Sequence, residues 1–137
     1  MVHALNQTYR LLRSGGELVN VHDLPAPHVI EIHGREVIQK VGWLMDKDDF
    51  ENERAALNAL AQVVSDHRFN LEDEQDFIYN IYIDELNEFY EWLAEWWSSA
   101  FLPDGISQRL AELIEDADPP TNIVLKVPAR MTKLRAV

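Results

Sequence analysis

The sequence predicts an α/β protein of mixed α+β content, in which an N-terminal helix and strand are followed by inserted helices and further strands. Apolar residues at helical spacing alternate along the chain with short runs rich in Val and Ile, which are typical of buried strands. The chain has 137 residues, of which 47% are apolar, enough for one core. We therefore expect a single domain over residues 1–137.

The first third of the chain predicts one helix and three strands. Leu5, Tyr9 and Leu12 recur at helical spacing, and Gly15-Gly16 ends this helix. An apolar run with few charges follows and ends before two prolines, as buried strands do. Two further runs flank Gly34-Arg35, which predicts a hairpin with a two-residue turn there. The segments are residues 3–13 for the helix, 17–22 for the first strand, and 29–33 and 36–41 for the hairpin.

The rest of the chain predicts three helical stretches and two strand regions. Asp48 and Asp49 are suited to cap an amphipathic helix over residues 49–67. Its apolar face carries Phe50, Leu57, Leu60, Ala61 and Val64. The acidic run 72–76 predicts a solvated turn. The other segments are a strand at 76–83, helices at 85–98 and from 106, and strands at 123–127 and 131–134, where Pro128 favours a sheet edge or a bulge.

Composition excludes several classes of partner and chemistry. Twelve basic residues stand against 24 acidic ones, and a net charge of −12 repels nucleic acids and anionic membranes. The chain has no cysteine and therefore no thiolate chemistry. It shows neither a signal-peptide pattern nor the roughly 20 apolar residues that a membrane span needs. We expect a cytoplasmic protein that binds neither nucleic acid nor membrane.

The glycines do not form a phosphate-binding loop. Such loops lie between a strand and the N-terminus of a helix, whereas Gly15-Gly16 follows a helix and precedes a strand. Gly34, Gly42 and Gly105 are isolated. No nucleotide fingerprint is present.

Three histidines and an aspartate crowd one short stretch: His22, Asp23, His28 and His33. Imidazoles with a carboxylate can bind zinc or iron, but His28 and His33 point to opposite faces of a regular strand. Solvated or turn histidines are the simpler interpretation, and we expect no metal site. His22 and Asp23 differ in one respect, because they end a strand, where α/β sheets place ligand groups.

The helix at 85–98 carries an aromatic stripe with Phe89, Trp92, Trp96 and Trp97. Core packing is the simplest role for such a stripe. Its width, however, exceeds what one core contact needs, so part of it is a candidate interface or ligand surface.

One stretch resembles a known family. "LNQTYRLLRSGGELVNVHDLP" resembles the helix, glycine turn and fifth strand of class I S-adenosylmethionine-dependent methyltransferases, with Ser14 in place of the usual proline. The later order of elements is also similar, with residues 77–83 and 123–134 as the two antiparallel closing strands. The resemblance covers nearly the whole chain and implies a partial methyltransferase-like sheet with helices packed on it.

The resemblance implies that the cofactor-binding half is missing. The family holds S-adenosylmethionine on a glycine-rich loop after the first strand and an acidic residue ending the second, and neither strand is represented here. We therefore expect no bound cofactor. His22 and Asp23, where the fifth strand opens toward the substrate side, are the only candidates for catalytic residues that the resemblance nominates.

Three functional interpretations remain open. The first is a noncatalytic methyltransferase-like half domain that acts by self-association or partner binding. The second is one subunit of a split methyltransferase, whose partner protein supplies the missing half. The third is a small-molecule binding module that uses the aromatic helix. We favour the first and expect a homodimer, because the strand with Val19 and Val21 would keep one unpaired edge and uncovered apolar faces.

Overall fold

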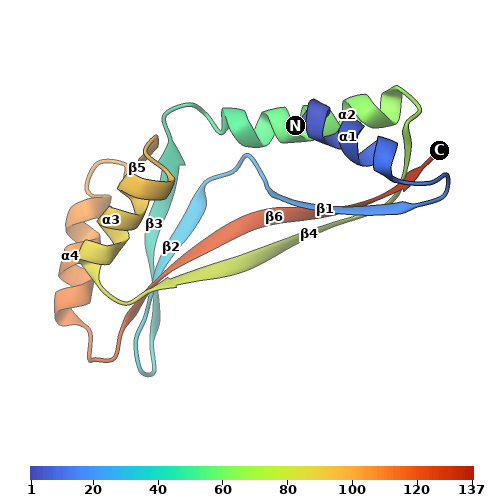
Figure 1. Ribbon diagram of the computed structural model, residues 1–137. Helices are drawn as coiled ribbons and strands as arrows, with labels where there is room; N and C mark the ends of the chain where they lie inside the picture. The colour runs from blue at the N-terminus through green and yellow to red at the C-terminus, as the bar shows by residue number, and fades with distance from the viewer. The chain divides into compact units, whose positions relative to one another are not determined.

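The computed structural model describes residues 1–137 and is an α+β fold with four helices and six mostly antiparallel strands in one open sheet (Figure 1). The helices are α1 (Val2–Leu11), α2 (Glu51–Ser65), α3 (Leu86–Trp96) and α4 (Ile106–Asp116). The strands are β1 (Glu17–Asp23), β2 (His28–His33), β3 (Ile38–Asp46), β4 (Phe69–Ile83), β5 (Ala100–Phe101) and β6 (Asn122–Ala136). None of the four helices has the length and apolar character needed to cross a membrane.

Internal contacts divide the chain into two compact units. The first contains residues 1–25, 50–77 and 128–137, and the second contains residues 26–49 and 78–127. The long strands β4 and β6 each contribute one half to each unit.

In the first unit, β6 lies between β1 and β4 (Figure 1). β1 and β6 are antiparallel, with Glu17 opposite Arg135 and Asp23 opposite Ala129. Helices α1 and α2 pack on one face of these strands. The core on that face is formed by Leu5, Ala59, Leu60, Val63, Phe69, Leu134 and Ala136, with Tyr9, Leu12, Leu18 and Val64 packed against it.

In the second unit, β2 pairs with both β3 and the first half of β6, and the short β5 pairs with β3. Helices α3 and α4 contribute Phe89, Leu93 and Leu110 to a core that also contains apolar residues of four strands. The strand residues of this core are Ile30, Ile32, Val41, Leu44, Ile83, Ile123, Leu125 and Val127.

Two predicted local features are wrong in detail. The β2–β3 turn lies at Arg35-Glu36, one residue later than expected, because Gly34 N donates to Val37 O (2.8 Å) and His33 stands opposite Ile38. Helix α2 begins after Phe50, which is buried in a left-handed conformation (φ 57°), and no side chain caps the helix. Asp48 and Asp49 precede that residue and therefore do not cap it.

The acidic run at 72–76 is also not a turn. It belongs to β4, because basic side chains of the neighbouring β6 pair with its carboxylates. Pro128 lies within β6 between the residues paired with β2 and those paired with β1, so its missing N–H interrupts neither register. Of the two alternatives expected for Pro128, a sheet edge or a bulge, the sheet edge is wrong, because β6 is paired on both edges.

Gly42 in β3 allows close contact between the sheet and α4. A Cβ added there would lie 2.5 Å from Ile106 Cδ1, so Gly42→Ala should lower the free energy of unfolding by about 1 to 3 kcal/mol. At Gly34 a Cβ would meet only Val37 O at 3.5 Å, so Gly34→Ala is the matched control. Urea denaturation measures both, and equal stability of the two variants would contradict the packing role of Gly42.

Candidate functional site

Strand β1 has one open edge. It pairs along its length with β6 and with no other strand. The backbone N–H and C=O groups on its other edge are therefore not bonded within the sheet, and such an edge is a template for another strand.

One face of β1 is covered by helices, and the other face is exposed. Leu18 packs against the core beneath α1 and α2, and Asn20 and His22 follow it on the same face. Val19 and Val21 point to the opposite face, where they are 56% and 58% exposed. The strand thus has an apolar face without a helix over it.

The glycine turn fixes the start of β1. Gly15 has φ +79°, a conformation that favours glycine, and its N–H donates to Ala136 O (2.9 Å) at the end of β6. Gly16 N donates to Arg13 O (2.9 Å), which closes the turn after α1. The turn thereby places the first residue of β1 opposite the end of β6.

His22 lies at the carboxyl end of β1 beside a group of ion pairs. It stands opposite Arg130, whose guanidinium makes bidentate contact with Asp76 (2.6 and 3.0 Å) and reaches Glu74 (3.2 Å). The Nδ1 atom of His22 is 2.9 Å from Asn20 Nδ2, and its buried Nε2 makes no hydrogen bond within the protein. We call His22, Asn20, Arg130, Asp76 and Glu74 the His22 cluster.

Burial and the nearby Arg130 lower the pKa of His22. The hydrogen bond from Arg130 lowers the pKa of Asp76. At neutral pH the cluster therefore holds a neutral imidazole and an ionised, paired carboxylate. This arrangement can exchange one proton or hydrogen bond at the imidazole, and no serine or threonine nucleophile is bonded to it.

A largely apolar cavity of about 550 Å³ adjoins the cluster, and Glu74, Arg130 and Thr132 are among its polar lining residues. The apolar stripe predicted for α2 is divided here. All three of Leu57, Leu60 and Ala61 line the cavity, but only Leu60 is buried and belongs to the core.

The aromatic residues of α3 occupy different environments. Phe89 is fully buried, whereas Trp92 is partly buried and packs against the same core. The Trp97 ring lies 4.7 Å from the His28 ring, and Trp96 is 71% exposed. Only the outer part of the predicted stripe is therefore open to a partner.

The histidines of β2 lie on alternating faces. His28 is buried, whereas His33 Nε2 lies 3.0 Å from Glu31 Oε1 on the other face. No group of three or more His, Asp or Glu side chains in the structure is arranged to hold a metal ion.

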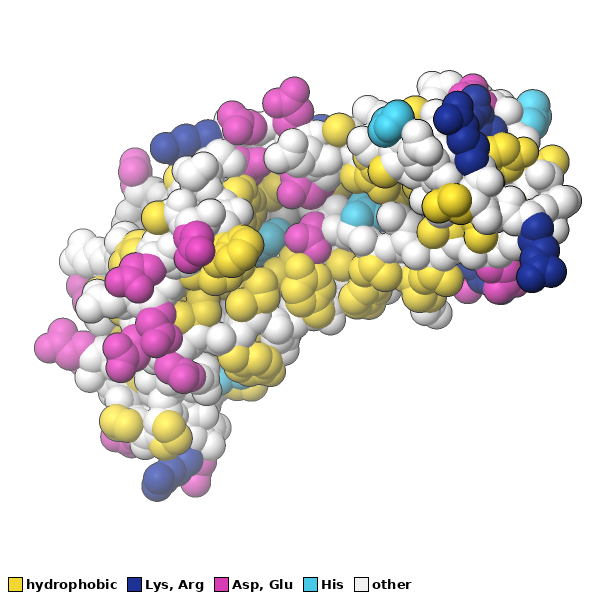
Figure 2. Space-filling model, viewed as in Figure 1, with side chains coloured by type: hydrophobic (Ala, Val, Ile, Leu, Met, Phe, Trp, Pro, Cys, Tyr) yellow, Lys and Arg dark blue, Asp and Glu magenta, His cyan; other side chains and the backbone are white.

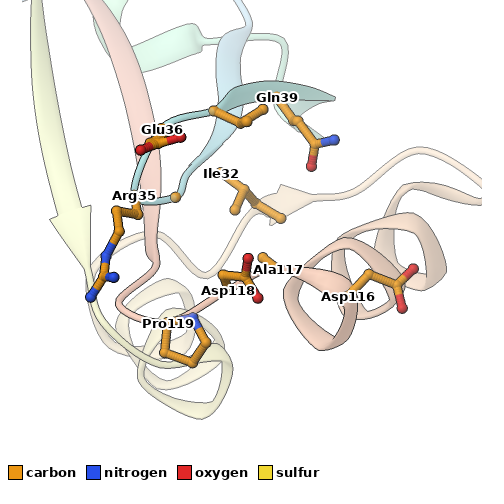
Figure 3. A pocket seen from close by; sticks show the side chains of 10 residues that line it. Ile32, Arg35, Glu36, Gln39, Asp116, Ala117, Asp118 and Pro119 are labelled. Atoms are coloured by element: carbon orange, nitrogen blue, oxygen red, sulfur yellow. The ribbon is translucent and has the colours of Figure 1, made fainter.

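A cavity of about 590 Å³ lies between the β2–β3 hairpin and the end of α4. Its acidic side chains, Glu36, Asp116 and Asp118, point to different parts of the cavity rather than toward one another (Figure 3). They therefore do not form a common binding point.

No family model, curated protein or solved structure matches this chain. The partners of His22, which are Arg130 and the carboxylates of β4, were not expected from the sequence. They lie more than 50 residues away along the chain, and the pairing of both β1 and β4 with β6 brings them together.

The lowered pKa of His22 gives a testable pH dependence. The unfolded chain protonates this residue near its ordinary pKa of 6.5, before the folded chain does. The stability that the folded chain gains by keeping His22 neutral is thus fully present above pH 6.5. It is lost as the pH falls through the lower pKa that His22 has in the folded chain. Between about pH 7.5 and about pH 5.5, His22→Gln should lose less stability than the unmodified chain, as measured by urea unfolding.

The exposed His3 provides the control, because it lies in α1 outside the cluster. His3→Gln should leave the pH dependence unchanged. If the free energy of unfolding of His22→Gln changes with pH as steeply as that of the unmodified chain, the cluster does not hold His22 neutral.

Proposed function

We propose that this chain is a methyltransferase-like half domain that lacks the S-adenosylmethionine-binding half, transfers no methyl group by itself, and acts by association through β1. One observation carries the proposal: β1 combines an open edge with a face that exposes Val19 and Val21. Strands with apolar residues on both faces normally lie inside a sheet.

The order of strands in the first unit supports the resemblance to class I methyltransferases. In that family the fifth strand lies between the fourth strand and an antiparallel closing strand. Here β1 has the antiparallel β6 on one edge, and β4 lies beyond β6. The open edge of β1 is the one that a fourth strand would occupy.

A second copy is suited to cover this surface. Fully burying a valine contributes about 1.5 to 3 kcal/mol, so two valines from each copy would supply several kcal/mol to a twofold contact. Charges near the patch are balanced, because Glu17 contacts both Lys133 (3.0 Å) and Arg135 (2.7 Å). The local surface therefore does not oppose pairing, although the whole chain carries a charge of −12.

The split methyltransferase is the second candidate. It is favoured by the polar end of β1, where His22 and Asp23 follow the exposed valines. In that case the open edge receives a strand of a partner protein, and His22 or Asp23 faces the substrate bound by the assembled pair. In both candidates the isolated chain does not bind S-adenosylmethionine, whereas an intact enzyme does. A measurement of cofactor binding therefore separates both candidates from an intact enzyme.

Size-exclusion chromatography with light scattering should give about twice the chain mass of 15.9 kDa. Val19→Lys should shift the chain to monomer or aggregate, because the lysine charge cannot be buried in the contact. Val37→Lys is the matched control, since Val37 is similarly exposed (58%) but lies on the β2–β3 hairpin. A monomeric unmodified chain, or equal effects of both variants, would overturn association of copies through β1.

Calorimetric titration of the isolated chain with S-adenosylmethionine should show no binding. The glycine-rich loop and the ribose-holding acidic residue of the family have no counterpart among these residues. A micromolar dissociation constant would contradict the noncatalytic interpretation and restore that of an enzyme.

A further inference from the structure

An apolar groove of about 490 Å³ lies in the second unit along one side of α3. One wall is formed by Tyr90, Leu93 and Ala94 of α3 and by Trp97, the residue that follows this helix. Ser98, Ala100 and Phe101 of β5, Leu102, and Ser107 of α4 complete it. Its volume is in the range of pockets that bind drug-sized ligands or large side chains.

Hydrogen bonds within the unit hold the walls of the groove in place. Tyr90 Oη and Ser107 Oγ are 2.7 Å apart and join α3 to α4. β5 pairs with the end of β3, and Lys47 N donates to Ser99 O (2.9 Å). The groove is therefore formed before any partner arrives, which lowers the entropic cost of binding.

Two aromatic side chains of the groove are accessible to a partner. Tyr90 and Phe101 are each 38% exposed. Aromatic side chains that are partly open and rigidly held are the groups that dominate binding energy at protein interfaces.

The charge around the groove indicates the kind of partner. Residues 84–118 contain ten Asp or Glu and a single basic residue, Arg109. Figure 2 shows acidic side chains gathered over α3 and α4. Such a field attracts cations and repels a second copy of this acidic unit.

We propose that the groove docks a basic polypeptide segment, which inserts an apolar side chain between α3 and β5 while its Lys or Arg side chains meet the carboxylates of α3 and α4. The groove binds the apolar side chain of the partner, and the negative charge of α3 and α4 selects a partner that is basic. This contact is separate from the β1 surface and does not depend on the function proposed for that strand.

Fluorescence anisotropy with three labelled peptides of equal length tests the proposal. One peptide combines lysines with leucines at helical spacing, the second replaces the leucines with serines, and the third replaces the lysines with glutamates. The Lys/Leu peptide should bind, more weakly as salt rises, and each of the others should bind at least about tenfold more weakly. Equal binding of the Lys/Ser peptide, or of the Glu/Leu peptide, would overturn the proposal.

Matched variants locate the binding. Ala94→Gln places a polar side chain into the groove and should weaken binding of the Lys/Leu peptide about tenfold. Ala111→Gln makes the same change at an exposed position of α4 outside the groove and should have no effect. The double variant Glu91→Gln with Glu95→Gln should reduce both the affinity and its salt dependence.

Two outcomes would locate the site elsewhere. Equal binding by the Ala94→Gln and Ala111→Gln variants would show that the groove is not used. Loss of peptide binding in Val19→Lys would show that the peptide occupies the β1 surface instead. Circular dichroism confirms that each variant is folded.

Discussion

Pairing of β6 on both of its edges is the constraint on which the rest of the structure depends. On one edge it binds β2 through residues 122–126 and β1 through residues 129–135, and β4 pairs with it as well. Its basic side chains hold the acidic half of β4: Arg135 contacts Glu72, and Arg130 contacts Asp76. Because β6 is the only strand that β1 pairs with, the other edge of β1 remains open.

Two strands of the molecule pair only with β6, and their chemistry differs. β4 is long and largely exposed, but its first half carries Glu72, Asp73, Glu74 and Asp76, and charges of this kind discourage pairing between copies. β1 is short and exposes Val19 and Val21 instead. We therefore propose the edge of β1, rather than that of the acidic β4, as the surface for association. The proposed docking groove in the second unit is a separate surface that selects a different kind of partner. Its surroundings are acidic, whereas the β1 patch is neutral.

Local patterns predicted most of the elements, and pairing between distant segments decided what was missed. Helical spacing and glycine positions located α1, α3 and α4, because these features act within a few residues. The acidic run at 72–76 was misread because its strand conformation depends on cations of β6. The same long-range pairing creates the His22 cluster, so the sequence indicated His22 but not Arg130. The place of Pro128 in the sheet was not predicted because the partner of β6 on one edge changes from β2 to β1 around that residue.

Hydrogen exchange of β1 at low and high protein concentration tests the central claim most directly. Alternate amides of an antiparallel edge strand are bonded to their neighbour, and the rest face the open edge. If copies associate through β1, the fast-exchanging amides within residues 17–23 become protected as concentration rises, while residues 69–77 of β4 do not change. Exchange in β1 that is independent of concentration, or protection that appears in β4 alone, would contradict the account.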